Sequence, residues 1–384
     1  MENINKQLSK AFNDMADGML SGQFGGKTRI GLTLIGSELG PEELHRAAQL
    51  VVAQYSDIEP VLIGQQMETD FELHQADDQL QSHEIMERLL AEGEIQGCVT
   101  LHYTFPFGIS TFGKVSTPAT GRDMIIASTT GTTDTNRIAA MVKNAINGIA
   151  LAKSTGIAEP TVGILNIDGA SQVERHLRKL QEQGYGIRFT ESSRADGGVT
   201  MRGNDLLKGT PDVMVTDSLT GNIMMKVFSS FTTGGSYEAF GYGYGPGLGE
   251  GSDKLVTIIS RASGAPVIAG AMRLCADAAK GRVLDICSEE MKQANKAGLD
   301  QILTGLKKPK APVEEKPEVT APPEKITDAD ISGIDILEIE DACQSLWAVG
   351  IYASTGMGCT GPIILIANED KEKATAHLKA AEYL

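Results

Sequence analysis

The sequence predicts a three-layer α/β protein with a mostly parallel sheet between two layers of helices, followed by a small C-terminal α/β module on a Pro-rich linker. Short apolar segments alternate with amphipathic ones over the first 300 residues or so, and five prolines crowd residues 307–325. Of the 384 residues, 41% are hydrophobic and 22% are charged, as in ordinary globular proteins. A core of this size needs neither disulfides nor a structural metal.

The predicted strands are short apolar segments separated by helical ones. The first, RIGLTLIG at residues 29–36, leads into a helical segment at residues 40–54, in which Pro41 suits the first turn. Further strands are predicted at residues 59–64, 97–103, 122–128, 161–167, 186–192, 212–218 and 254–260. Such alternation favours a parallel sheet with its chemistry at the carboxyl ends of the strands.

Four segments follow from the composition. They are an N-terminal extension at 1–28, a main domain at 29–306, the linker at 307–325 and a C-terminal module at 326–384. The proline density of the linker excludes a helix or a central strand and favours an extended tether. Within the module we expect an apolar helix face, a glycine-rich loop at 353–362, a strand at 362–367 and a closing helix capped by Asn368.

Charge and cysteine content narrow the possible partners. With 34 basic and 50 acidic residues the net charge is −16, which argues against nucleic acid or an anionic membrane as the main partner. Neither a signal peptide core nor an apolar run of about 20 residues is present, so we expect a cytoplasmic protein without a membrane span. Five cysteines without a CxxC pair predict free thiols.

Three familiar motifs do not fit. The GGKT at residues 25–28 is not a phosphate-binding loop, because Ser21 stands where the first glycine is required and the segment precedes a strand. The glycine-rich run at residues 234–251 has no register that satisfies GxGxxG, so we expect either a mobile active-site loop or a flexible connection. The histidines are isolated, and no metal is expected.

The most informative segment is residues 202–228, where Asp217 ends a buried strand and Asn222 and Lys226 follow it. A strand-end Asp followed by Gly-Asn and a helical Lys resembles the pattern of the phosphate acyltransferases and phosphate acetyltransferases. Residues 161–168 look like the interdomain strand of the same family. The resemblance implies their fold, which is like that of isopropylmalate dehydrogenase, over roughly residues 29–305.

Two further segments carry the resemblance. TTGTTDTNRIAAM at residues 129–141 is similar to the Thr-Asp-x-x-Arg stretch of the family, which implies an anion-binding role for Thr133 and Arg137. IISRASG at residues 258–264 resembles its Ser-Arg loop, which implies phosphate or acyl contacts for Ser260 and Arg261.

The same cations suit anion binding on chemical grounds. A guanidinium offers bidentate hydrogen bonds to phosphate oxygens, and backbone N–H groups near a helix start add more donors. Arg137, Arg261 and Lys226 could hold phosphate, Asn222 and Lys226 could stabilise an acyl oxygen, and Asp217 could orient Lys226 or another donor. The alternative is that these cations only pair with surface carboxylates.

The cysteines divide into two groups. Cys359 lies among glycines in residues 353–362, where converging N–H groups can lower a thiol pKa and stabilise a thioester oxyanion, so it is the candidate nucleophile. The alternative for Cys359 is a small residue in a tight turn. Cys275, Cys287 and Cys343 are expected in the core, as is Cys98, for which a role as a secondary thiol stays open.

A nucleophilic cysteine on a tethered module also resembles the subunits of the glycine, sarcosine and betaine reductase complexes, over the whole chain. This resemblance implies that a selenoprotein, protein A, carries a carboxymethyl group, which becomes an acetyl thioester on a cysteine. Phosphate then releases acetyl phosphate, so inorganic phosphate is a co-substrate and no cofactor is expected. A ketoacyl synthase-like beta subunit would be the partner in a hetero-oligomer.

Other functions remain possible from the sequence. The chain could be a stand-alone phosphate acyltransferase, or a scaffold whose tail, with 3 basic and 10 acidic residues from residue 326 onward, only docks partners. A metal- and nicotinamide-dependent dehydrogenase would need an aspartate cluster and a nucleotide loop, and the sequence shows neither.

Overall fold

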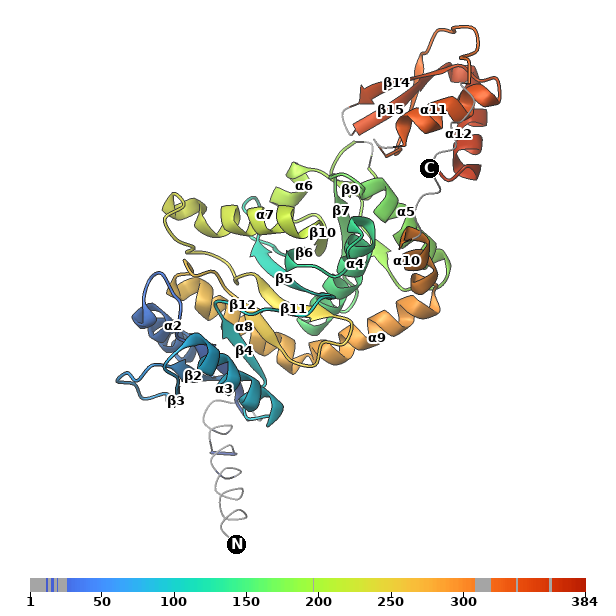
Figure 1. The fold of residues 1–384 in the computed structure, drawn as a ribbon. Coiled ribbons are helices and arrows are strands. Elements are labelled where there is room, and N and C mark those ends of the chain that lie inside the picture. The colour runs from blue at the N-terminus through green and yellow to red at the C-terminus, as the bar shows by residue number, and fades with distance from the viewer. Residues whose placement is uncertain are drawn as a thin grey trace.

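The computed structural model describes residues 26–195, 197–307, 319–335, 338–358 and 361–384, together with four isolated positions near the N-terminus (Figure 1). The main domain contains a twelve-stranded sheet in the order β3-β2-β1-β4-β12-β11-β5-β6-β10-β7-β8, with β9 beside β7. The strands are β1 (Thr28–Thr33), β2 (Ile58–Gly64), β3 (Glu72–Gln75), β4 (Gly97–Thr100), β5 (Ile109–Ser116), β6 (Asp123–Gly131), β7 (Thr161–Leu165), β8 (Arg188–Phe189), β9 (Thr200–Met201), β10 (Val213–Val215), β11 (Gly245–Gly249) and β12 (Val256–Ile258).

Helices cover both faces of this sheet, so the predicted layered α/β fold is confirmed. Alternate residues of a strand point to opposite faces, and in β2 Leu62 joins the core under α2 and α8 whereas Val61 and Ile63 join a smaller core under α3. The helices are α2 (Pro41–Gln54), α3 (Gln79–Ala91), α4 (Arg137–Ser154), α5 (Ala170–Glu182), α6 (Gly203–Lys208), α7 (Ser218–Ser230), α8 (Ala265–Lys280), α9 (Val283–Lys296) and α10 (Leu299–Lys307).

The two halves of the sheet run in opposite directions. Strand β12 is parallel to β4, and β4 to β1, whereas β11 is antiparallel to β12, β5 to β11 and β6 to β5. Strand β10 is parallel to β6, and β7 is parallel to β10. The carboxyl ends of β1, β4 and β12 therefore lie at one edge, called here the β12 edge. Those of β6, β10 and β7 lie at the opposite edge, called the β6 edge.

The antiparallel strands β5 and β11 in the middle of the sheet were not predicted. Strand β11 comes from the glycine-rich run at 234–251, so the expectation of a loop there is wrong for residues 245–249. A Cβ on Gly245 would lie 1.7 Å from the carbonyl oxygen of Phe112, and one on Gly249 would lie 2.1 Å from that of Gly108. These glycines allow the backbones of β5 and β11 to come close.

The C-terminal module has its own sheet and core. Strands β13 (Ala329–Ser332), β15 (Gly361–Ile366) and β14 (Ala353–Gly358) form an antiparallel sheet in that order. The helices α11 (Ile339–Ala348) and α12 (Lys371–Ala380) cover it. Residues 353–358 thus form a strand where a glycine-rich loop was expected, because they pair with β15.

The cap expected from Asn368 is also absent. A short 3-10 turn, η2 (Asn368–Asp370), precedes α12, and no side chain among its described residues caps the helix. The backbone N–H of Asn368 instead donates to Asp328 Oδ1 at 2.7 Å. Among the described residues, no helix is both long and apolar enough to cross a membrane.

Candidate functional site

Two of the sequence-predicted residues meet at the β6 edge. Arg137 is the first residue of α4, which follows β6, and Asp217 is the N-cap of α7, which follows β10. The Arg137 Nη2 donates to Asp217 Oδ2 at 2.9 Å. Because β6 and β10 are neighbours and parallel, their carboxyl ends bring these side chains together from positions 80 residues apart.

Asp217 is held as a carboxylate by three donors. Its Oδ1 accepts from the N–H of Thr220 and its Oδ2 from the Thr220 hydroxyl, both at 2.9 Å, in addition to Arg137. Burial on its own would raise the pKa of Asp217, but these hydrogen bonds and the guanidinium charge outweigh burial and hold the pKa below its usual range. Asp217 therefore orients Arg137 at neutral pH. It does not contact Lys226, which points elsewhere.

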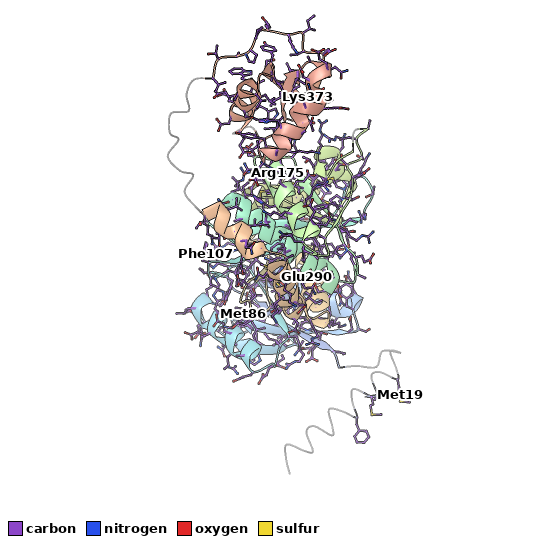
Figure 2. The ribbon with its side chains drawn as sticks, turned by 90° about the vertical axis from the view of Figure 1, so that its right-hand side faces the viewer. Met19, Met86, Phe107, Arg175, Glu290 and Lys373 are labelled. Carbon is purple, nitrogen blue, oxygen red and sulfur yellow. The ribbon has the colours of Figure 1, made fainter. Side chains whose placement is uncertain are left out.

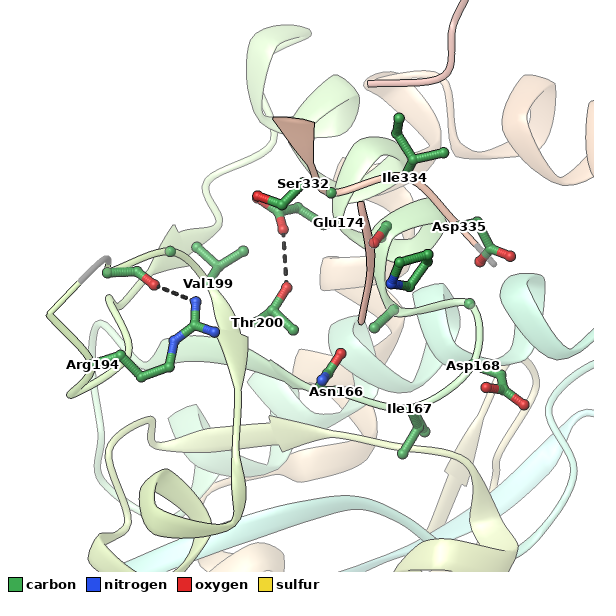
Figure 3. A pocket seen from close by; sticks show the side chains of 17 residues that line it. Asn166, Ile167, Asp168, Glu174, Arg194, Val199, Thr200, Ser332, Ile334 and Asp335 are labelled. Atoms are coloured by element: carbon green, nitrogen blue, oxygen red, sulfur yellow. Dashed lines mark hydrogen bonds between the residues drawn. The ribbon is translucent and has the colours of Figure 1, made fainter. Parts of the chain in front are cut away.

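Asp168, at the end of β7, extends this arrangement towards a cavity. Its Oδ2 lies 3.8 Å from Arg137 Nη1. Asp168 also lines a cavity of about 460 Å³ between the end of β7, the start of α5 and the C-terminal module (Figure 3). The module contributes residues 332–335 and Pro362 to the cavity wall, so both parts of the chain meet beside the Arg137 site.

The contact that holds the module at this cavity is made by α5. Arg175 Nη2 donates to Glu338 Oε2 at 2.9 Å, and Nη1 donates to the carbonyl of Glu382. Figure 2 shows Arg175 at the junction of the main domain and the module. The C-terminal module and the main domain therefore interact through Arg175, which is partly buried.

A second group of predicted residues lies at the β12 edge. Ser260 and Arg261 follow β12, and Lys226 lies in the last turns of α7, which runs back along β6 away from Asp217. Lys226 Nζ is 3.9 Å from Glu238 Oε1 and 5.6 Å from the ring centroid of Tyr244. Ser260 and Lys226 thus both lie near Glu238 at the β12 edge, whereas Arg137 lies at the β6 edge.

Glu238 ties this second group together. It is only 5% exposed, and its carboxylate accepts from the hydroxyls of Tyr244 at 3.1 Å and Ser263 at 3.0 Å. The Ser263 hydroxyl also accepts from the N–H of Ser260 at 3.0 Å. Arg261 is exposed and, within the described part of the chain, forms no ion pair, so its guanidinium is available to an anion.

The remaining predicted residues take less direct positions. The Thr133 hydroxyl is buried and donates towards Asn144 Oδ1 at 2.9 Å and the carbonyl of Ala140 at 3.1 Å, so it supports the start of α4 in this structure. Asn222 is half-buried on α7, about one turn after Asp217. The anion-binding roles of both residues remain predictions.

Four cysteines are buried, as expected for core residues. Cys98 has no exposed surface, and burial raises the pKa of its thiol well above the usual value, so it has no path to a substrate here. Burial likewise raises the pKa of Cys275 and Cys287 to about 12 and that of Cys343 to about 11. Cys359 lies outside the described residues, so its predicted role as nucleophile stays a prediction.

Glu72, His74 and Glu94 are a group that could in principle hold a metal among the described residues. Arg29 hydrogen-bonds the carboxylates of Glu72 and Glu59 and the backbone carbonyl of Glu94, so a metal ion would compete with Arg29 for the Glu72 carboxylate.

Asp168, Arg175, Glu238 and Tyr244 were not singled out from the sequence. Asp168 ends the 161–168 segment and could have been found as a strand-end carboxylate. No local sequence motif marks Arg175 or Glu238, because their hydrogen-bond partners lie 163 and 25 positions away in the sequence, respectively.

Comparison with known proteins places the chain in a family. A family model described as "Fatty acid synthesis protein" matches residues 28–365. The chain is 51% identical over 381 residues to the glycine/sarcosine/betaine reductase complex component C subunit alpha of Peptoclostridium acidaminophilum, covering 99% of both chains. A phosphate acyltransferase of Brucella canis is 37% identical over 87 residues, which are 22% of this chain and 25% of the relative.

A crystal structure of a branched-chain phosphotransacylase from Enterococcus faecalis superposes with a TM-score of 0.48 at 12% identity, covering 66% of this chain and 99% of that one. The layered α/β sheet and the family model that matches residues 28–365 define the class of this protein. The chain belongs to the fatty acid synthesis protein family and, within it, to the family of the reductase-complex component C alpha subunits. The resemblance identified from the sequence motifs is thus confirmed.

Proposed function

We propose that this chain acts in a glycine, sarcosine or betaine reductase complex, where it carries an acetyl group as a thioester on Cys359 and transfers it to phosphate. The observation that carries the proposal is 51% identity over 99% of the chain, including the module and its cysteine segment. The docking of the module beside the Arg137 site supports an exchange between module and main domain.

The proposed reaction is a simple acyl transfer. The Cys359 thiolate holds the acetyl group as a thioester, and an oxygen of inorganic phosphate attacks the thioester carbonyl. The carbon–sulfur bond breaks, acetyl phosphate leaves, and the thiolate is regenerated without any change of oxidation state. Donors that stabilise the developing oxyanion contribute on the order of 3 kcal/mol each.

We assign phosphate to the β12 edge. Arg261 is exposed and without an ion pair among the described residues, and Ser260 precedes it, so the charge of Arg261 is available to phosphate. Lys226 lies at the same edge but already pairs with Glu238 at 3.9 Å. At the β6 edge Arg137 already faces the carboxylates of Asp217 and Asp168, which oppose a second anion. We therefore assign phosphate binding to Arg261 and not to Arg137, whereas the sequence led us to expect that both arginines hold phosphate.

We propose that the Pro-rich residues 307–325 act as a tether, which would reach roughly 60 Å when extended, enough to move the module between the edges of one domain. A tether of this length would let the C-terminal module reach two positions on the main domain. We propose that the module rests at the β6 edge and delivers its acyl group at the β12 edge. The acetyl group would derive from the carboxymethyl group of selenoprotein A, whose selenium and a thiol would supply the two electrons by ending as a selenium–sulfur bond. The beta subunit of protein C would bind this chain.

The test is mass spectrometry of the purified full chain after incubation with acetyl phosphate, beside Cys359→Ala and a matched Cys343→Ala variant. We expect a hydroxylamine-labile acetyl group on Cys359 in the wild type and in Cys343→Ala, and none in Cys359→Ala. Acetylation that persists in Cys359→Ala would contradict the nucleophile. Acetyl phosphate turnover without any acetylated cysteine would favour direct transfer, as in a stand-alone phosphate acyltransferase.

A further inference from the structure

Glu238 is a buried carboxylate that lies between α7 and β11 in the sequence and beside the loop of residues 260–264 at the β12 edge. Only 5% of its surface is exposed. Burying a carboxylate is costly unless hydrogen bonds satisfy its oxygens, and its charge opposes an anion bound nearby. A carboxylate next to the residues to which we assign phosphate must therefore contribute something that outweighs this repulsion.

One carboxylate oxygen controls the backbone of Ser260. Glu238 Oε2 accepts from the Ser263 hydroxyl at 3.0 Å. The oxygen of the same hydroxyl accepts from the N–H of Ser260 at 3.0 Å. Because the Ser263 proton is directed to Glu238, the lone pairs of its oxygen are left for the Ser260 amide. Glu238 thus orients, through a single intervening side chain, the residue that precedes Arg261.

The other carboxylate oxygen reaches the side chain of Ser260. Glu238 Oε1 accepts from the Tyr244 hydroxyl at 3.1 Å. Burial and the Glu238 charge raise the pKa of Tyr244, and a hydrogen bond from the Ser260 side chain opposes this shift. Ser260 Oγ also accepts from the N–H of Ala262 at 3.2 Å, which leaves its own proton for Tyr244. Both the backbone and the hydroxyl of Ser260 are thus tied to one carboxylate.

The path of the two loops does not depend on this side chain. The N–H of Glu238 donates to the carbonyl of Ala262, and the N–H of Gly264 donates to the carbonyl of Glu238, both at 2.8 Å. These backbone hydrogen bonds hold the loops together whatever side chain position 238 carries. The carboxylate determines how Ser260 is oriented, and at 3.9 Å it also attracts the ammonium of Lys226 from α7. A substitution of Glu238 therefore tests orientation while the loop path stays in place.

We propose that Glu238 is the positioning residue of the phosphate site at the β12 edge. Through Ser263 and Tyr244 it holds Ser260, and with it the Arg261 that follows, in the orientation that phosphate requires. This inference rests on the proposed function, because it concerns the site to which that function assigns phosphate. Glu238 does not touch phosphate itself, since its charge would repel the anion. Reacting groups displaced by about 1 Å can slow a reaction about 100-fold, so such positioning has a measurable effect.

The first test measures single-turnover release of the acetyl group from the acetylated full-length chain over a range of phosphate concentrations. Glu238→Ala should slow this release about 100-fold at fixed phosphate, because Ser260 loses both of its anchors. Glu238→Gln should recover most of the rate, since its amide oxygen can accept from Ser263 and its amide N–H can donate to the Tyr244 oxygen. Release by Glu238→Gln that is as slow as by Glu238→Ala would overturn positioning through hydrogen bonds.

Glu290 provides a matched control for the loss of a buried carboxylate. It is also 5% exposed, and it also accepts from a tyrosine and a lysine, Tyr185 at 2.8 Å and Lys153 at 2.5 Å. It lies on α9, which packs against α4, and not at the loop of residues 260–264. Glu290→Ala should lower the Tm about as much as Glu238→Ala does but release the acetyl group at the wild-type rate. Equal release by the two variants would overturn the role of Glu238.

The second test is independent of acyl transfer. Hydrogen exchange of the full-length chain should become at least about tenfold faster in peptides that contain the Ser260 amide after Glu238→Ala, and should not change there after Glu290→Ala. Unchanged exchange after Glu238→Ala would show that the carboxylate does not hold Ser260. A wild type that releases no acetyl group to phosphate would contradict the proposed function, whereas wild-type release rates in Glu238→Ala would contradict only the role of Glu238.

Discussion

Arg175 of α5 and Glu338 of the C-terminal module are joined by a hydrogen-bonded ion pair of 2.9 Å between residues 163 positions apart. Their side chains are 25% and 19% exposed, so solvent screens the pair only partly. Arg175 also donates to the carbonyl of Glu382, near the end of the chain. One arginine thus contacts the start of α11 and the residues after α12, in a module that carries a net charge of −7 from 3 basic and 10 acidic residues.

Arg175→Ala should release the module from the main domain. Charge-assisted hydrogen bonds contribute about 1.5–3 kcal/mol, so the equilibrium constant for docking should fall roughly tenfold or more. Small-angle X-ray scattering should then show a larger radius of gyration, and hydrogen exchange should rise in α5. Arg178→Ala is the matched control, because Arg178 pairs only within the main domain with Glu174 and Phe189. Equal expansion in both variants would exclude a specific role for Arg175.

Arg261→Ala should depress phosphate-dependent release of the acetyl group while Cys359 acetylation from other donors is retained. Loss of one charged donor to phosphate should reduce turnover about 100-fold at fixed phosphate. Single-turnover release from acetylated protein measures this step. Arg46→Ala, at an exposed arginine of α2, should behave as the wild type. If acylation and release fall equally in Arg261→Ala, the proposed division of labour is wrong.

Asp217 should make stability depend on pH. Its pKa is lowered in the folded state, so the carboxylate stabilises the fold above the ordinary pKa near 4 and this contribution is lost as pH falls through the folded pKa. Asp217→Asn can still cap α7 but loses the charge. We expect its Tm to be a few degrees below wild type at pH 7 and the gap to close as the pH falls below about 4. Asp253→Asn, at an exposed aspartate, should show no such trend.

Gly221→Ala should destabilise the protein although alanine favours helices. The new Cβ would clash with the Ser128 carbonyl at 1.8 Å, and overpacking of this kind costs about 1–3 kcal/mol. Gly305→Ala in α10 is the matched control, because no atom lies within 4 Å of its added Cβ, and it should gain about 0.5–1 kcal/mol. Urea unfolding measures both. A stable Gly221→Ala would show that α7 can move away from β6.

Much of the fold was predictable because its signals are local. The strand segments ending near Gly64, Thr100 and Leu165 are apolar runs of the right length. The Pro-rich linker stays a prediction, because residues 308–318 lie outside the described residues. Segments that depend on partners were missed. The glycines of β11 and β14 predict loops locally, yet they form strands because β5 and β15 lie beside them.

The candidate site shows the same division. Sequence motifs identified the family, which the comparisons confirm, and they predicted a site of five residues, whose roles stay predictions: Arg137, Asp217, Lys226, Ser260 and Arg261. Only the tertiary structure decided that they form two groups, because β5 and β11 reverse the sheet between β12 and β6. Periodicity along a chain reports which residues are buried, but it carries no information about whether distant strands pair in parallel or antiparallel. That pairing places Arg137 beside the docked module and Arg261 at the opposite edge.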